Sequence, residues 1–263
     1  MSRRLLARRP VLALCAAWAL SAGLVGAETL TMAPVGAAET VTVCDKGKLG
    51  FGTGVMTSTA VGSTAWTIVA PHGHVPTGST TGENLAWRIY DPGTERIVDR
   101  MGPALGANRV VAKGYETSTT RANVNRPTEL VGGSIERNTT RALNIYNRFR
   151  TCTLAMASHV RNYVEIHGYS NAGSIQVATV GVSAAEASAA KTAWGDRLGV
   201  SLVIEPVDTI EWNAKENKAI GMLSLKFFDR AIHVELPVAL RRDARLAETS
   251  AALTDWLTRQ FAP

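Results

Sequence analysis

The chain has little cysteine, no internal repeat, no low-complexity tract and no long block of charge of one sign. Of its 3 cysteines, Cys15 lies in an apolar leader, so that Cys44 and Cys152 remain in the rest of the chain. Neither lies near a second cysteine or a histidine at metal-ligand spacing, which argues against a cysteine-based metal site. Two cysteines in a chain with an export leader are compatible with a Cys44–Cys152 disulfide.

Two further absences narrow the function. The sequence has no Gly-x-Ser-x-Gly motif, which argues against a serine hydrolase with a nucleophile elbow. Without its first 27 residues the chain loses four arginines and no acid, and its formal charge falls from +6 to +2 (24 Lys and Arg against 22 Asp and Glu). The basic charge therefore belongs largely to the leader, and a nucleic-acid partner loses its main support.

Residues 1–27 are typical of a secretory signal peptide. Two arginine pairs precede an apolar stretch at residues 11–25, and small residues follow it. The stretch is short for a membrane anchor. Cleavage after residue 27 is expected, with Ala38 as the alternative, and the sequence from Ser2 resembles a twin-arginine export motif. We therefore expect a secreted or periplasmic protein, with a flexible tether at residues 28–40 and a single domain at residues 41–263.

The rest of the chain alternates strand and helix patterns. Strands are expected at residues 41–43, 66–70, 110–112, 163–167, 175–182, 202–204 and 231–236. Helices are expected at residues 80–90, 134–156 (one helix or a pair), 183–198 and 246–261, with a loop-rich section at residues 91–108. Ser183 and Glu186 have the spacing of a capping box. This alternation predicts an α/β fold, a three-layer sandwich with a mixed, mostly parallel sheet.

Three predicted strands end on polar residues that are capable of chemistry. His72 follows the strand at residues 66–70, His167 ends the strand at residues 163–167, and Glu235 lies near the end of the strand at residues 231–236. An unpaired buried charge costs several kcal/mol, so such residues need partners. Because ligands gather at the carboxyl ends of strands in sheets of this kind, all three are expected at one edge of the sheet.

Each of these residues also has a structural interpretation. His72 could cap a helix or bond to backbone, and a single histidine such as His167 is often structural. Glu235 could form a buried salt bridge with Arg241 or Arg242. His233 shares a strand face with Glu235 and competes for any role given to the others.

A further pair, Asn125 and Arg126, has the chemistry of a carboxylate clamp. Arginine offers a planar fork of donors that holds a carboxylate through two parallel bonds, and asparagine adds a directional amide. Such a pair in a loop is also common at a protein surface. Tyr169, which follows His167 and Gly168, could contact a substrate or could simply pack.

Taken in order, these segments resemble the zinc carboxypeptidases and their wider relatives, the poly-gamma-glutamate hydrolases and N-formylglutamate amidohydrolases. His167-Gly168-Tyr169-Ser170-Asn171 resembles the His-Ser-Tyr-Ser-Gln segment that supplies a zinc-binding histidine in that family. Pro71-His72-Gly73-His74 resembles the Pro-His-Gly-Gly segment of poly-gamma-glutamate hydrolases. The peptidase motif His-x-x-Glu is absent, because position 75 is valine.

The resemblance implies a zinc site and roles for the residues around it. His72, Glu83 and His167 would hold Zn²⁺, with His74 as the alternative to Glu83. Glu235 would be the general base. Arg121 would stabilise the oxyanion, and the substrate would be bound by Asn125, Arg126 and Tyr169.

Two function classes follow. The first is a secreted zinc-dependent amide hydrolase, of carboxypeptidase or amidohydrolase type, that acts on peptide-like or gamma-glutamyl substrates with a free carboxylate. The second is a catalytically silent, metal-poor module that binds acidic peptides or cell-wall fragments, which the missing His-x-x-Glu motif favours. Neither needs a nucleic acid or a stable membrane span.

Overall fold

An eight-stranded sheet forms the centre of the fold, and its middle strands are apolar because both faces are covered. The computed structural model describes residues 39–62, 64–73, 91–117, 120–132, 135–157, 161–169, 173–211 and 228–262. The sheet strands are β1 Thr40–Lys46, β2 Val55–Ala60, β3 Trp66–Gly73, β4 Asn108–Lys113, β8 Asn162–Tyr169, β9 Ser174–Val180, β10 Ser201–Ile204 and β11 Arg230–Pro237. Near-continuous burial along β3, β8 and β11 is typical of parallel strands between two layers.

The sheet is mixed, with a parallel centre. Its strand order is β1-β2-β4-β3-β8-β11-β9-β10. β4, β3, β8 and β11 run parallel to one another, whereas β2 is antiparallel to β4 and β9 is antiparallel to β11. The carboxyl ends of β3, β8 and β11 therefore meet at one edge, as the sequence predicts.

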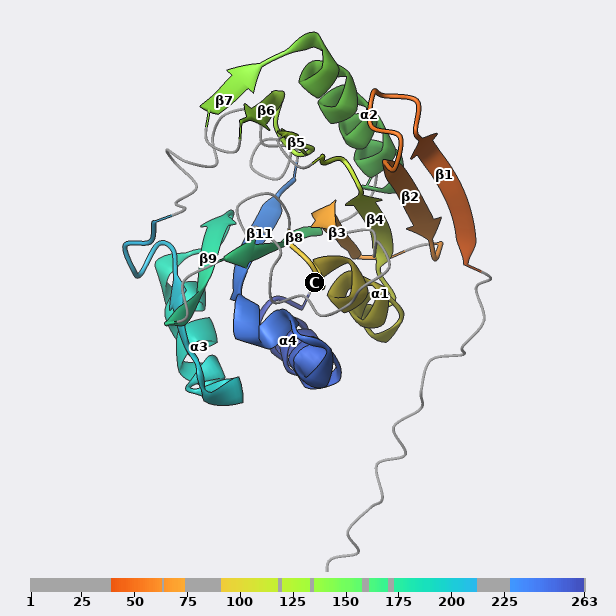
Figure 1. Cartoon of the computed structure of the whole chain (residues 1–263). Helices are drawn as coiled ribbons and strands as arrows, with labels where there is room; N and C mark the ends of the chain where they lie inside the picture. The colour runs from red at the N-terminus through yellow and green to blue at the C-terminus, as the bar shows by residue number, and fades with distance from the viewer. Residues whose placement is uncertain are drawn as a thin grey trace, which may run out of the picture. The chain divides into compact units, whose positions relative to one another are not determined.

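Helices cover both faces of this sheet (Figure 1), and the predicted α/β fold class is confirmed. The helices are α1 Thr94–Leu105, α2 Thr140–Ala157, α3 Ala184–Trp194 and α4 Leu246–Gln260. One core cluster joins the sheet to α1, α3 and α4, with Met101, Trp194 and Trp256 among its large members. A second cluster, which includes Phe149 of α2, lies on the opposite face. The predicted capping box is present at the start of α3.

Two stretches differ from the expected elements. The section at residues 91–108, expected to be loop-rich, contains α1, because Ile97, Val98 and Met101 form a buried face on the sheet. The helix expected from residue 134 begins at Thr140, because the chain first completes a small three-stranded sheet. That sheet consists of β5 Thr120–Asn123, β6 Thr128–Val131 and β7 Ile135–Asn138.

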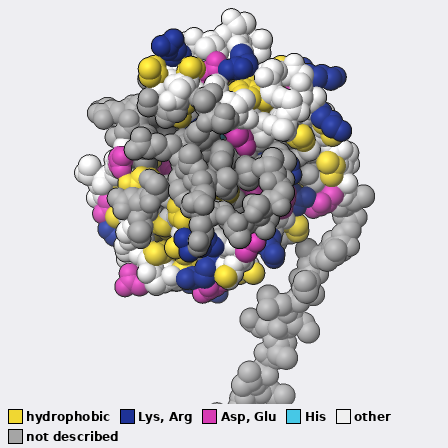
Figure 2. All heavy atoms as spheres, in the orientation of Figure 1, with side chains coloured by type: hydrophobic (Ala, Val, Ile, Leu, Met, Phe, Trp, Pro, Cys, Tyr) yellow, Lys and Arg dark blue, Asp and Glu magenta, His cyan; other side chains and the backbone are white. Residues whose placement is uncertain are grey.

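Several predictions fall on residues that the structure does not describe. The signal peptide, its cleavage sites and most of the tether lie outside the described residues, and so does the helix expected at residues 80–90. Within the described part of the chain, no helix combines the length and the apolar character needed to cross a membrane. On the face shown in Figure 2, the described basic and acidic side chains are interspersed without a broad patch of one sign.

A disulfide joins Cys44 of β1 to Cys152 of α2, which confirms the pairing considered above. The two cysteines are 108 residues apart, so the bond constrains a long loop of the unfolded chain. We expect the Cys44→Ser, Cys152→Ser double variant to lose about 2–5 kcal/mol of unfolding free energy, as is typical when a native disulfide is removed. Urea unfolding of the variant and of the oxidised wild type measures this loss. Equal midpoints and slopes would contradict it.

Candidate metal centre

The candidate site lies where β3, β8 and β11 end side by side. His72 is near the end of β3, and His167 is near the end of β8. In β11, Glu235 is the direct register partner of His167. The strand pairing therefore brings together the three residues that the sequence predicts at this edge.

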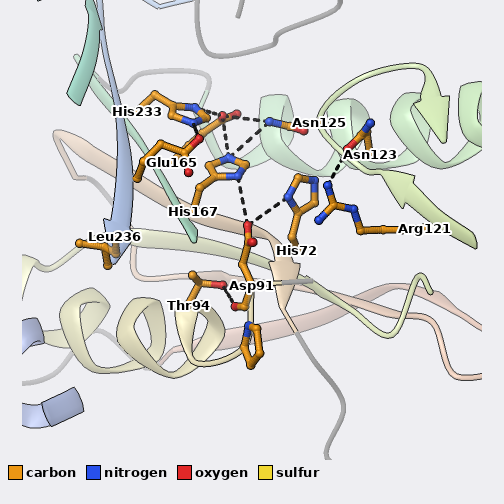
Figure 3. A network of polar contacts seen from close by, with 12 residues as sticks. His72, Asp91, Thr94, Arg121, Asn123, Asn125, Glu165, His167, His233 and Leu236 are labelled. Carbon is orange, nitrogen blue, oxygen red and sulfur yellow. Dashed lines mark hydrogen bonds and ion pairs between the residues drawn. The ribbon is translucent and has the colours of Figure 1, made fainter. Parts of the chain in front are cut away.

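A fourth residue, Asp91, completes a cluster with the two histidines (Figure 3). Oδ2 of Asp91 lies 3.2 Å from Nδ1 of His72 and 3.5 Å from Nδ1 of His167. Donor atoms about 2.1 Å from a tetrahedral zinc ion are about 3.4 Å apart, so both spacings suit one ion held between them. The cluster of His72, Asp91 and His167 thus has the donor types and spacing of a three-residue metal site.

Three hydrogen bonds to the backbone of Asp91 fix it beside the histidines. The Asp91 N–H donates to the carbonyl oxygen of His72 at 3.0 Å, which holds Asp91 against the end of β3. The Asp91 carbonyl oxygen in turn accepts bonds from the backbone N–H and the hydroxyl of Thr94, at 3.2 and 2.8 Å. Asp91 is therefore set between the end of a strand and the start of α1. The sequence analysis missed this residue; its one signal is the position of Asp91 just before an amphipathic helix.

The far side of His167 is held by Glu165. Nε2 of His167 lies 3.2 Å from Oε2 of Glu165, while its Nδ1 faces Asp91. Metal-binding histidines commonly place the second ring nitrogen on a carboxylate, which fixes the tautomer and the ring orientation. Glu165 is therefore suited to support a metal ligand, a role that the sequence analysis also missed.

Glu165 belongs to a second cluster, with His167 and His233, that is less suited to a metal. Its Oε2 lies 2.8 Å from Nδ1 of His233 and accepts a bond from Nδ2 of Asn125 at 3.1 Å, and its Oε1 accepts the Tyr163 hydroxyl at 2.8 Å. Glu165 and His233 are fully buried. Because protein donors already use both carboxylate oxygens, we assign Glu165 to the supporting network.

Burial and neighbouring charges give His72 and Asp91 the protonation states that a metal ligand needs. Burial, together with the Arg121 charge, lowers the pKa of His72 to about 3 against the effect of Asp91, so His72 is neutral at pH 7. Burial alone would raise the pKa of Asp91, but bonds to His167 and His72 hold it well below its usual range. Burial likewise opposes ionisation of Glu165, but His167 and His233 lower its pKa. The cluster therefore offers the neutral imidazole of His72 and the ionised carboxylate of Asp91. Burial lowers the pKa of His167, but its bonds to Asp91 and Glu165 raise it above the usual value, so His167 has to release a proton when it binds an ion.

Glu235 lies beside the cluster and is bound to His233. Its Oε1 is 3.0 Å from Nε2 of His233, and the residue is largely buried. The His233 ring also stacks on that of His167, with centroids 4.1 Å apart. His233 thus contacts both the candidate ligand and the candidate base, rather than replacing either of them.

Arg121 lines a small pocket together with His72. The pocket is also lined by Pro71, Gly73, Tyr115, Glu116, Ala122 and Val124. Nη2 of Arg121 donates to Oδ1 of Asn123 at 3.3 Å. Among the described residues, neither Nε of Arg121 nor Nε2 of His72 has a hydrogen-bond partner, although both atoms are buried. The sequence-predicted cation is therefore next to the metal cluster.

The other predicted site residues lie further out or are engaged elsewhere. Asn125 is buried in the β5–β6 turn and donates to Glu165. Arg126 is partly exposed, with Nη1 3.8 Å from Oε1 of Glu136, and the Tyr169 hydroxyl donates to Glu211. Glu83 and His74 lie outside the described residues. The binding roles predicted for these residues stay predictions.

The fold and the site together define an α/β protein with a candidate metal centre at the carboxyl edge of its sheet. No protein-family model and no curated protein matches the sequence. The crystal structure of a gene product from Agrobacterium tumefaciens is similar, with a TM-score of 0.50 and 10% identity over 76% of this chain and 91% of the other. That likeness shows a shared fold.

Two further solved structures have lower TM-scores. A bacteriophage poly-gamma-glutamate hydrolase has a TM-score of 0.44 at 12% identity, covering 87% of this chain and 92% of its own. A metallo-carboxypeptidase from Burkholderia cenocepacia has a TM-score of 0.47 at 13% identity, covering 85% of this chain and 64% of its own. Both belong to the classes that the sequence motifs resemble.

Proposed function

We propose that this protein is a zinc-dependent amide hydrolase of the carboxypeptidase or amidohydrolase type. The observation that supports this most is the spacing of His72, Asp91 and His167, whose donor atoms all lie within 4.8 Å of one another. Two histidines and one carboxylate are a common protein ligand set for catalytic zinc, which keeps its fourth position open. The missing glutamate of the His-x-x-Glu motif favoured a silent binding module. In this proposal, Asp91 provides the carboxylate ligand in its place.

When bound, zinc would polarise the scissile carbonyl and make a water molecule more acidic. The chain supplies the remaining steps. Glu235 takes the proton of the attacking water on a carboxylate oxygen and returns it to the leaving nitrogen. His233 orients that carboxylate through its 3.0 Å contact with Oε1. Arg121 stabilises the negative charge that develops on the carbonyl oxygen.

We further propose that the substrate is peptide-like or gamma-glutamyl and carries a free carboxylate. Arg126 is the partly exposed cation at the β5–β6 turn, and Asn125 of the same turn contacts the supporting network of the metal cluster. A substrate carboxylate bound by Arg126 would replace its 3.8 Å contact with Glu136. Asn125 would then hold the turn, and Tyr169 would line the approach. The leader would direct the enzyme to a secreted or periplasmic location.

A substrate screen tests the function. The protein is purified, stripped of metal and reloaded with Zn²⁺. It is then assayed on peptides with a free C-terminal carboxylate, on gamma-glutamyl amides and on N-acyl amino acids. We expect zinc-dependent release of an amine from at least one class of substrate. The KM for that substrate should be higher in the Arg126→Ala variant than in the wild type. Binding of acidic peptides without zinc and without turnover would instead support the silent module.

A further inference from the structure

Arg241 contacts the three residues that directly follow three of the site residues in the sequence. It ends the short 3-10 helix Val238–Arg241 that follows β11, and it is buried. Its Nε donates to the carbonyl oxygen of Leu236 at 3.2 Å, and its Nη1 donates to that of Pro92 at 2.8 Å. Its guanidinium also packs on Gly168. Leu236, Pro92 and Gly168 follow Glu235, Asp91 and His167, respectively.

Two glycines leave the space that Arg241 fills. A Cβ atom at Gly168 would lie 2.3 Å from Cζ of Arg241 and 2.5 Å from its Nη2, so a larger residue would displace the guanidinium. Gly93 has a φ of +92°, and a Cβ there would lie 2.3 Å from the Arg241 carbonyl oxygen. Both the side chain and the backbone of Arg241 are therefore fitted against segments that carry the site.

The charge of Arg241 also acts on the site. Burial lowers its pKa, whereas Asp91, Glu235 and Glu95 oppose that effect. Arg241 in turn contributes to the low pKa of Asp91, after the bonds from His167 and His72. A buried guanidinium is costly unless it is paired and hydrogen-bonded. Here its charge is balanced by the carboxylates of the site that it supports.

We propose that Arg241 is a positioning residue that holds the segments of Asp91, His167 and Glu235 in the spacing required by a metal and a general base. This role rests on the proposed function. The contacts themselves do not, because one guanidinium contacts the segment before α1, the end of β8 and the end of β11.

The test compares Arg241→Met, Arg241→Lys and Gly168→Ala with the matched control Arg109→Met. Arg109 is likewise buried and packed on a glycine, Gly102, but it lies on β4 and pairs with Glu39. Zinc affinity is measured by chelator competition on the full chain. We expect Arg241→Met and Gly168→Ala to weaken zinc binding about 10–100-fold, as the loss of outer supports of metal ligands does. Arg241→Lys, which keeps the charge but loses the fork, should fall between wild type and Arg241→Met.

Zinc affinity within about twofold of wild type in Arg241→Met would overturn the proposal. An equal loss in Arg109→Met would also overturn it, because the effect would then reflect general destabilisation. Imidazole nitrogen NMR of the metal-free proteins gives a second readout, in which the His167 signals should shift in Arg241→Met and stay unchanged in Arg109→Met. If the wild type bound no zinc, the proposed function would fail, and these metal-free signals would still decide whether Arg241 positions the site.

Discussion

The Glu235→Gln variant should bind zinc as the wild type does and lose amide hydrolysis by about 10²–10⁴-fold, the usual contribution of a general acid–base group. Glutamine keeps the shape of the side chain and can still contact His233, but it cannot accept a proton from water. Glu235 lies beside His167, a proposed zinc ligand, in the strand register. Its carboxylate can therefore act as the base if it faces the water bound at the metal. Turnover of the substrate found in the screen measures the loss, and metal analysis of the same sample measures retention.

A matched control separates this effect from the loss of a buried charge. Glu129 is also buried, but it lies in β6 of the small sheet. Its carboxylate accepts two hydrogen bonds from Arg141. The Glu129→Gln variant should lower stability and leave the rate per folded, zinc-loaded molecule close to that of the wild type. Full activity of Glu235→Gln would remove Glu235 from the mechanism.

The second large effect concerns Asp91, the proposed third metal ligand. Asp91→Ala should weaken zinc binding by more than about a hundredfold, because the loss of a direct ligand exceeds the 10–100-fold cost of losing its outer supports. Glu83→Ala, at the carboxylate that the sequence analysis assigned to this place, should bind zinc like the wild type. Chelator competition with both proteins measures the difference.

The His74→Ala variant completes this comparison, since His74 was the alternative ligand. Under the present assignment it retains zinc affinity. Loss of zinc in Glu83→Ala or His74→Ala, with normal binding in Asp91→Ala, would contradict the assignment of Asp91. Circular dichroism and thermal unfolding of each variant show that the compared proteins are folded.

The strand ends could be predicted from the sequence because the pattern is local. A buried run such as Tyr163 to His167 specifies a strand, and parallel strands deliver their last residues to one edge. His72, His167 and Glu235 were found in this way. Asp91 could not be, because its place depends on the bond from its N–H to the His72 carbonyl, which brings together two points far apart in sequence.

The missed supporting residues have the same cause. Glu165 lies inside a strand whose other residues are mostly apolar, and its partners come from β8, β11 and the β5–β6 turn. The sequence suggests Arg241 only as a salt-bridge partner of Glu235, whereas its side chain donates hydrogen bonds to the carbonyl oxygens of Leu236 and Pro92. The β5–β7 sheet was missed because its strands are only four residues each and largely polar. Such short strands are stabilised by pairing and by α2 rather than by local pattern.

Elemental analysis of the purified full-length protein tests the central claim most directly. After dialysis against buffer with a small excess of Zn²⁺ and removal of the unbound ion, the account predicts one zinc per chain in the wild type. Less than a tenth of an equivalent, in a protein that circular dichroism shows to be folded, would contradict a metal centre at His72, Asp91 and His167.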